Sequence, residues 1–129
     1  MAGDRRSIAF TLNGLGTLAL LQKDFPEAEK FLKNALQTSN DLELTPLTID
    51  ILIGFAELWL EEAKYEVAYC LLNEALSQPG IEKQTQDRGE QIKVQIESLI
   101  PADTIRHMNA RDTQKTLPEV ANEVLGILS

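Results

Sequence analysis

The feature that most constrains this chain is an internal repeat with a period of forty residues. When the sequence is aligned with itself at that offset, residues of one size class coincide, so that Leu12 falls on Leu52 and Gly16 on Ala56. Small residues recur where helices approach closely, and large residues recur where space must be filled. The other matched pairs are Leu15 with Phe55, Phe25 with Tyr65, Ala28 with Ala68, Leu32 with Leu72, Ala35 with Ala75 and Leu36 with Leu76. A repeat of this length predicts a stack of similar helical units.

Each unit is predicted to be a pair of helices joined by a tight turn. In the first unit, about residues 5–41, the apolar spacing predicts a helix over about 5–22. Lys23 and Asp24 form the turn, and Pro26 opens the second helix, where its missing N–H costs nothing. In the second unit, about 45–78, Thr45 is the predicted N-cap and Pro46 follows it at the first helical position. Helices are predicted there over about 45–62 and 65–77.

The rest of the chain carries signals for further helices. Pro79-Gly80 is a strong helix stop, after which the apolar spacing predicts a capping helix over about 81–100. The tail, about 101–129, is predicted to hold a short helix over 104–109 and a last helix that starts at a capping box of Thr116 and Glu119. No segment alternates with a period of two, so no sheet is expected. We therefore predict one all-α domain over 1–129, an α-solenoid of antiparallel helix pairs with C-terminal capping helices.

Charge and composition exclude several classes of function. The net charge is −8 and the pI is about 4.6, and such an acidic surface disfavours binding to nucleic acids and anionic membranes. The most apolar stretch, residues 47–60, contains Asp50 and Glu57 and is too short to span a bilayer. The single cysteine, Cys70, cannot form an internal disulfide, and the N-terminal residues lack the apolar run of a signal peptide. We expect a cytoplasmic protein.

The repeated residues resemble the tetratricopeptide pattern, in which Leu-Gly in the first helix is followed by an aromatic residue at the turn and then by Ala, a bulky residue and Ala. The first unit carries this pattern as Leu15-Gly16, Phe25, Ala28, Leu32 and Ala35, and the second as Phe55-Ala56, Tyr65, Ala68, Leu72 and Ala75. The second unit departs at Ala56, where glycine is commoner, and both units exceed the usual length of about 34 residues. This longer variant is similar to the tetratricopeptide arrays of large bacterial signalling proteins and of kinesin light chains. The resemblance covers about residues 4–78 and implies a protein-binding module.

The two ends of the chain extend the resemblance. Residues 3–9 resemble the joint between repeats inside such arrays. Residues 99–121 resemble the segment that closes them in multidomain ATPase-type transcriptional regulators. These likenesses imply the C-terminal sensor or scaffold part of a larger bacterial signalling regulator, whose partners include other domains of the same parent chain. The alternative is a stand-alone adaptor or assembly chaperone of the same fold.

The reactive side chains predict no catalytic, cofactor or metal site. His107 is the only histidine, and no sequence signature provides it with a catalytic partner. Cys70 stands in an apolar run and is expected to pack as a small hydrophobe. An acidic group lies on the first helix of the second unit: Asp50, Glu57, Glu61 and Glu62. Because the spacing of a calcium-binding loop is absent, these carboxylates are better interpreted as a solvated helix face or a partner contact. We therefore do not expect an enzyme.

In the tetratricopeptide family the first helices of successive units line a concave face. Carried over by the repeat alignment, this implies a groove lined by Phe10, Asn13, Thr17 and Leu20, then by Asp50, Ile53, Glu57 and Glu61, and on the fifth helix by Glu90, Lys93 and Glu97. Acidic residues stand where the carboxylate-binding clamp of some chaperone-binding members needs lysine or arginine. We therefore expect a basic or mixed-charge peptide as the partner, with charge acting mainly on association rate and selectivity.

Two residue types in the first helices predict close packing. Gly14 and Gly54 are repeat equivalents, and a glycine inside a helix costs about 1 kcal/mol relative to alanine. We therefore expect both glycines to share a packing or groove-lining role. Trp59 stands at the position of Ala19 in the first unit, and we expect it to fill the core.

The first helix is also predicted to expose an apolar face. If the chain starts in mid-array, the side of that helix that would pack on a preceding repeat is exposed, and Ile8 and Leu12 form an apolar patch there. Terminal repeats that lack a polar outer face associate or lose solubility. We expect a homodimer or a concentration-dependent oligomer.

Overall fold

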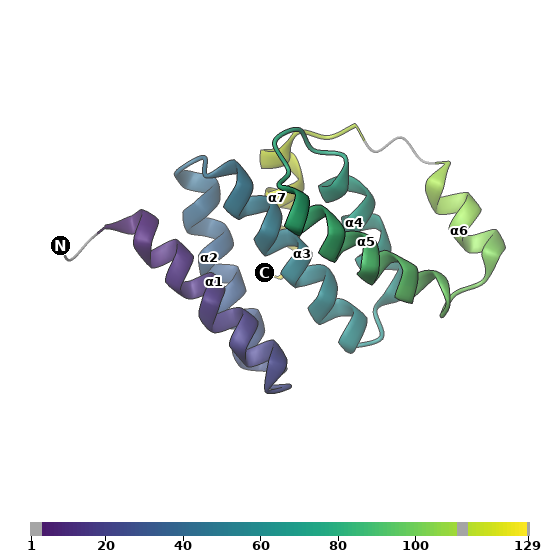
Figure 1. The fold of residues 1–129 in the computed structure, drawn as a ribbon, viewed down its shortest axis with the longest axis horizontal. Coiled ribbons are helices and arrows are strands. Elements are labelled where there is room, and N and C mark those ends of the chain that lie inside the picture. The colour runs from purple at the N-terminus through teal and green to yellow at the C-terminus, as the bar shows by residue number, and fades with distance from the viewer. Residues whose placement is uncertain (1–3, 111–113, 129) are drawn as a thin grey trace.

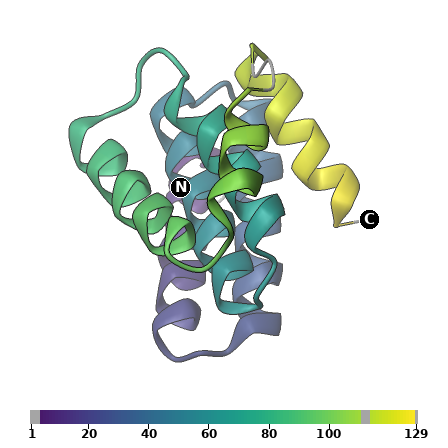
Figure 2. The ribbon, with the colours of Figure 1, turned by 90° about the vertical axis from the view of Figure 1, so that its right-hand side faces the viewer.

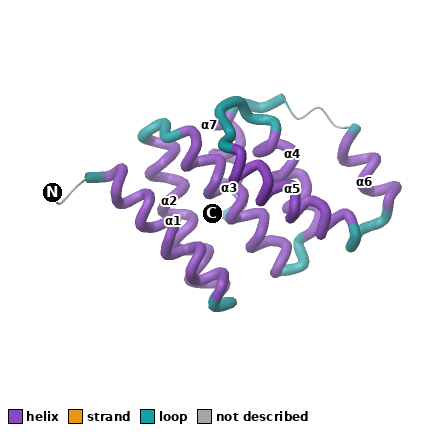
Figure 3. The backbone as a smooth tube through the Cα atoms, in the orientation of Figure 1, coloured by secondary structure: helices purple, strands orange, loops and turns teal. Residues whose placement is uncertain are grey.

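The computed structural model describes residues 4–110 and 114–128, and these residues form seven helices (Figures 1 and 3). The helices are α1 (Arg5–Leu21), α2 (Phe25–Asp41), α3 (Thr45–Glu61), α4 (Tyr65–Leu76), α5 (Lys83–Glu97), α6 (Ala102–Asn109) and α7 (Leu117–Ile127). The described part of the chain contains no strand, which confirms the predicted all-α class. None of the described helices is both long and apolar enough to cross a membrane.

The first four helices begin at intervals of twenty residues, at positions 5, 25, 45 and 65. The three turns between them share one geometry, because Lys23, Glu43 and Ala63 all adopt the left-handed conformation, with φ of 59°, 55° and 62°. In each turn the following N–H donates to a carbonyl five residues earlier, at 2.8 or 2.9 Å. This is the hydrogen bond of a Schellman motif, which ends a helix and satisfies a terminal carbonyl. The chain therefore reverses in the same way three times, and the helices lie side by side (Figure 1).

Short-range capping sets the starts of several helices. Asp4 caps α1 and Asp24 caps α2, each by accepting the backbone N–H of the residue three positions later at 3.4 Å. Thr116 and Glu119 form the predicted capping box at the start of α7. The prediction for Thr45 was wrong, because Thr45 is the first residue of α3 and the preceding leucine holds the N-cap position without a side-chain bond. The Schellman turn after α2 ends at the preceding leucine, so α3 begins one residue earlier than predicted.

Helix α3 lies at the centre of the molecule and contacts α1, α2, α4, α5 and α7. Its side chains are therefore buried around most of its circumference, including Phe55, Leu58 and Trp59. The rings of Phe55 and Trp59 pack with their centroids 5.8 Å apart. Trp59 thus fills the core, as the sequence predicts. Helix α1, by contrast, packs mainly against α2 and α3 and leaves its outer side exposed.

The last three helices surround the end of this stack. Helix α5 packs against α3 and α4, whereas α7 packs against α2, α3 and α4. Figure 2 shows that α5 and α7 lie on opposite sides of the stack. Helix α7 buries Val120, Ala121 and Val124 in this contact. Helix α5 is shorter than the predicted 81–100, because the loop opened by Pro79 and Gly80 continues to residue 82.

Candidate functional site

Helices α1, α3 and α5 bring polar side chains into direct contact around Asp50 of α3. Asn13 of α1 donates from Nδ2 to Asp50 Oδ2 at 2.9 Å. From α5, the hydroxyl of Thr85 and the guanidinium of Arg88 donate to Asp50 Oδ1 at 3.4 and 3.3 Å. Arg88 also forms an ion pair with Glu57 at 3.5 Å. We call these five residues the polar network, and they link α1, α3 and α5.

The charged members of the polar network are partly exposed, whereas Thr85 is buried. The side chains of Asp50 and Glu57 are each 32% exposed, and that of Arg88 is 28% exposed. At this depth an ion pair is screened less by salt than a fully exposed pair is. Arg88 carries one positive charge against two carboxylates, so the network keeps a negative excess at neutral pH. It can therefore accept hydrogen bonds and attract a cation without losing its own internal contacts.

Gly54 makes room for this arrangement. A Cβ atom at residue 54 would lie 3.9 Å from Arg88 Nη2 and 3.4 Å from the side chain of Leu32. A Cβ atom at Gly14, its repeat equivalent, would have no neighbour within 4 Å. The expectation of a shared role in packing was therefore wrong for Gly14, whereas a groove-lining role stays a prediction. Only the glycine on the central helix has neighbours, because only that helix is covered on the relevant side.

The sequence predicted Asn13, Asp50 and Glu57 but missed Thr85 and Arg88. The repeat alignment assumes an offset of forty, whereas α3 begins at residue 45 and α5 at residue 83. This slip of two residues turns the alignment by about 200° around the axis of α5. At the corrected offset of thirty-eight, Asp50 aligns with Arg88. The Pro79-Gly80 break was the available signal, since it shortens α4 to twelve residues against seventeen in α2.

The residues predicted on α5 gather instead around Tyr69 of α4. Tyr69 donates its hydroxyl to Glu97 Oε2 at 2.7 Å, and Lys93 Nζ lies 5.5 Å from the centre of its ring. Burial, followed by the hydrogen bond to Glu97, raises the pKa of Tyr69 to about 12, with a smaller contribution from the charge of Glu90. The structure therefore places Glu90, Lys93 and Glu97 beside α4 and not in the polar network.

Three other predicted groove residues remain accessible. Phe10 is half-exposed, and the guanidinium of Arg6 lies 5.7 Å from its ring centre. Thr17 is partly buried and donates its hydroxyl to a backbone carbonyl one turn earlier in α1 at 3.0 Å. Glu61 forms an exposed ion pair with Lys23 at 3.6 Å. These residues flank the polar network on α1 and α3 without joining it.

The prediction was wrong for Leu20 and Ile53. Leu20 is 6% exposed and Ile53 is fully buried, so neither side chain can meet a partner. Both residues belong to the main hydrophobic core. The alignment placed them in a groove because their repeat positions match, but apolar side chains at these positions turn inward between packed helices.

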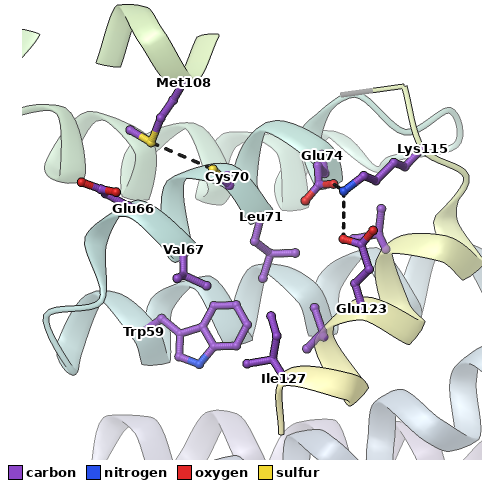
Figure 4. Close-up of a pocket in the computed structure, with 12 residues that line it drawn as sticks. Trp59, Glu66, Val67, Cys70, Leu71, Glu74, Met108, Lys115, Glu123 and Ile127 are labelled. Atoms are coloured by element: carbon purple, nitrogen blue, oxygen red, sulfur yellow. Dashed lines mark hydrogen bonds and ion pairs between the residues drawn. The ribbon is translucent and has the colours of Figure 1, made fainter. Parts of the chain in front are cut away.

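A second candidate site is a pocket between α4, α6 and α7 (Figure 4). Its volume is about 310 Å³. Lys115 borders it and donates to Glu74 at 2.8 Å and to Glu123 at 2.9 Å. These two bonds, the one to Glu74 above all, raise the pKa of the Lys115 ammonium above its usual range. No local sequence signal indicates this pocket, because its walls come from helices that are distant in the chain.

The remaining reactive side chains are Cys70 and His107. Cys70 is partly buried, and its Sγ lies 4.0 Å from Met108 Sδ of α6. His107 is exposed on the same short helix. Among the residues that the structure describes, no three His, Cys, Asp or Glu side chains are grouped to hold a metal ion.

Comparisons with protein-family models, with curated proteins and with solved structures found no match to this chain. The polar network and the pocket are two features of the described residues on which a function can be based. The polar network crosses three helices and presents an open face. The pocket is small and enclosed mainly by apolar side chains.

Proposed function

We propose that this chain is an interaction module of tetratricopeptide type, in which α1, α3 and α5 line the concave face of an α-solenoid and bind a peptide or protein. The observation that carries the proposal is the polar network, because Asn13, Asp50 and Arg88 come from α1, α3 and α5 and meet on one face. The shared turn geometry at Lys23, Glu43 and Ala63 supports the solenoid, since it repeats one rotation from helix to helix. Stacked helix pairs of this kind use extended concave surfaces for binding.

The partner is a basic or mixed-charge segment. Two carboxylates and one guanidinium form the centre of the face, and Glu61 adds a further carboxylate that only an exposed lysine balances. A lysine or arginine of the partner would find Glu57 and Glu61 one helical turn apart on α3. Arg88 would donate to a backbone carbonyl or an acidic side chain beside them. Such complementarity favours fast and selective association more than raw affinity.

The biological setting follows from the resemblance of the repeats. We propose the C-terminal sensor or scaffold part of a larger bacterial signalling regulator that works in the cytoplasm and whose partner is another protein or another domain of the same chain. A stand-alone adaptor or assembly chaperone is the alternative. In neither setting does this chain act as an enzyme or bind nucleic acid directly. A reading frame that continues upstream into nucleotide-binding motifs favours the regulator, and a complete short gene favours the adaptor.

The binding face is tested with a variant that removes negative charge without introducing electrostatic repulsion. Glu57→Lys would place a second cation beside Arg88, so we choose the double variant Glu57→Gln/Glu61→Gln. The matched control is Glu29→Gln/Glu43→Gln, which makes the same change of net charge on α2 and on the turn after it. Partners are captured from native cytoplasm, identified, and measured as synthetic peptides by calorimetry at low and high salt.

The proposed binding face predicts how the wild type, the control and the double variant differ in affinity for the peptide. The control should bind the peptide as the wild type does, and the double variant should bind it about two- to tenfold more weakly at low salt. High salt should reduce that difference, because the contribution is electrostatic. Equal affinity of all three proteins at low salt would move the binding face away from α3 and refute the proposal.

We also propose that a second copy of the chain covers the outer side of α1. Ile8, Leu15, Leu18 and Leu21 are exposed on α1, whereas Leu12, which the sequence placed on this surface, is partly buried against the core. Sedimentation equilibrium of the wild type should show a monomer–dimer equilibrium, and Leu18→Glu/Leu21→Glu should sediment as a monomer. A wild type that remains monomeric at several hundred micromolar would refute self-association.

A further inference from the structure

The pocket between α4, α6 and α7 lies apart from the polar network, on the side of the stack that carries α7 (Figures 2 and 4). Its volume of about 310 Å³ falls at the lower end of the range for small-molecule sites. Five of its lining side chains are at most 4% exposed: Trp59, Leu71, Met108, Val120 and Val124. At the mouth, Val67 is 42% and Ile127 is 61% exposed. The pocket therefore has an apolar floor that opens to solvent between two apolar side chains.

The charged residues stand at the two ends of this apolar floor. Figure 4 shows Glu66 at one end and Lys115 with Glu74 and Glu123 at the other. Lys115 already donates to both neighbouring carboxylates, so its charge is satisfied within the protein. Glu66 forms no ion pair with any basic residue in the described ranges. Three carboxylates against one ammonium leave the lining negative, in a chain whose net charge is already −8.

We propose that this pocket binds a small amphipathic cation, with its apolar body on Trp59 and Leu71 and its protonated amine beside Glu66. The size of the pocket suits an aromatic ring with a short alkyl chain. An anion is disfavoured because the surrounding carboxylates repel it and because Lys115 has no unpaired charge to offer. A neutral molecule gains the apolar contacts but leaves Glu66 without a counter-charge. The site is independent of the binding face formed by α1, α3 and α5.

Binding at this position also links the tail to the rest of the molecule. Trp59 and Leu71 belong to α3 and α4, whereas Val124 and Ile127 belong to α7 and Met108 to α6. A molecule that touches all of these helices binds only when the tail is in place. Binding to the folded state alone raises its stability in proportion to the logarithm of ligand concentration.

The test uses one carbon skeleton with three head groups: 4-phenylbutylamine, 4-phenylbutan-1-ol and 4-phenylbutyrate. Trp59 is the only tryptophan of the chain and lines the pocket, so its fluorescence reports occupation directly. We expect saturable changes in fluorescence and a rise in the melting temperature with the amine. The amine should bind about fivefold tighter than the alcohol, as one partly exposed charge pair allows, and the carboxylate should bind most weakly.

Two pairs of variants locate the site. Val67→Phe fills the mouth and should abolish binding, whereas Val94→Phe makes the same change at an exposed position of α5 and should bind normally. Glu66→Gln should lower affinity for the amine to that for the alcohol, and Glu90→Gln on α5 should not. Because Val67, Glu66, Val94 and Glu90 are all exposed, these variants should fold as the wild type does.

Several outcomes would overturn the proposal. Equal binding of the amine and the alcohol would show a purely apolar pocket and remove the role of Glu66. Tighter binding of the carboxylate than of the amine would mean that Lys115 recognises an anion, which is the opposite of the proposed charge preference. Absence of saturable binding by all three ligands at millimolar concentration, or unchanged binding in Val67→Phe, would show that the pocket is not the site.

Discussion

Helices α1 and α3 occupy equivalent places in the repeat and have the same length of seventeen residues, yet the molecule buries them very differently. Four residues of α1 are buried, against eleven of α3. Leu18 and Leu58 are repeat equivalents, and Leu18 is 49% exposed whereas Leu58 is fully buried. A repeated sequence pattern therefore determines that a helix forms. The neighbouring helices determine how much each of its side chains contributes to stability.

The largest expected effect comes from making the same substitution in both helices. Leu58→Ala should lower the free energy of unfolding by about 2–5 kcal/mol, because it leaves a cavity in the core. Leu18→Ala should cost less than about 1 kcal/mol, because half of that side chain already meets water. Urea unfolding at low micromolar concentration measures both, since dimerisation through α1 would otherwise bury Leu18. Similar losses at that concentration would contradict the comparison.

The two glycines of α1 should respond with opposite signs. A Cβ atom at Gly16 would lie 2.7 Å from Leu32 Cδ2, and Leu32 is fully buried and cannot move freely. Gly16→Ala should therefore destabilise the protein by about 1–2 kcal/mol through overpacking. Gly14→Ala should stabilise it by up to about 1 kcal/mol, since the position is open and alanine favours the helix. Stabilisation by both substitutions in thermal unfolding would show that α1 is not packed tightly on α2.

The second helices of the two units, α2 and α4, also differ, and this difference affects stability at alkaline pH. Tyr69 of α4 is fully buried, whereas its repeat equivalent on α2 is Glu29, which is partly exposed. The pKa of Tyr69 is raised to about 12 from an ordinary value of 10, so between pH 10 and 12 the unfolded chain binds fewer protons than the folded one. Stability should therefore fall as pH rises through this window. Lys115 should add to the loss above its ordinary pKa of 10.5, because its ion pairs favour the charged form.

Replacing Tyr69 by phenylalanine separates the two contributions. Tyr69→Phe should lose less stability between pH 8 and pH 11 than the wild type does, as measured by urea unfolding at both values. It should not abolish the loss, because Lys115 remains. A wild-type pH dependence in the variant would mean that Tyr69 is not held in its neutral form by burial and Glu97.

The smallest expected effect comes from the turns inside the two repeat units, where the same substitution should change stability by the same amount. Lys23 and Ala63 both adopt the left-handed conformation in turns of the same geometry, and both are exposed. Lys23→Gly and Ala63→Gly should each stabilise the protein by about 1 kcal/mol, because glycine takes this conformation without strain. Loss of the exposed ion pair between Lys23 and Glu61 should subtract little. Melting temperatures that move in opposite directions would show that the two turns differ.

The local signals in the sequence were enough to predict much of the fold. The apolar spacing, the prolines and the capping box of Thr116 and Glu119 predicted seven helices, with the largest errors at the ends of α5. The candidate site was predicted less well. The polar network contains the predicted Asn13, Asp50 and Glu57, but Arg88 was missed and Ile53 was misplaced, because both errors depend on how a helix is rotated against its neighbours.

Local signals in the sequence account for most helix boundaries, because caps, turns and prolines act through hydrogen bonds within a few residues. Only the tertiary structure decided which side of each helix is covered, that α5 presents Arg88 to Asp50, and that α7 packs opposite α5 to close a pocket with α4. These features join segments about forty or more residues apart. A helical pattern repeats every 3.6 residues, so a shift of two residues in a loop turns a whole helix to another face without changing its pattern.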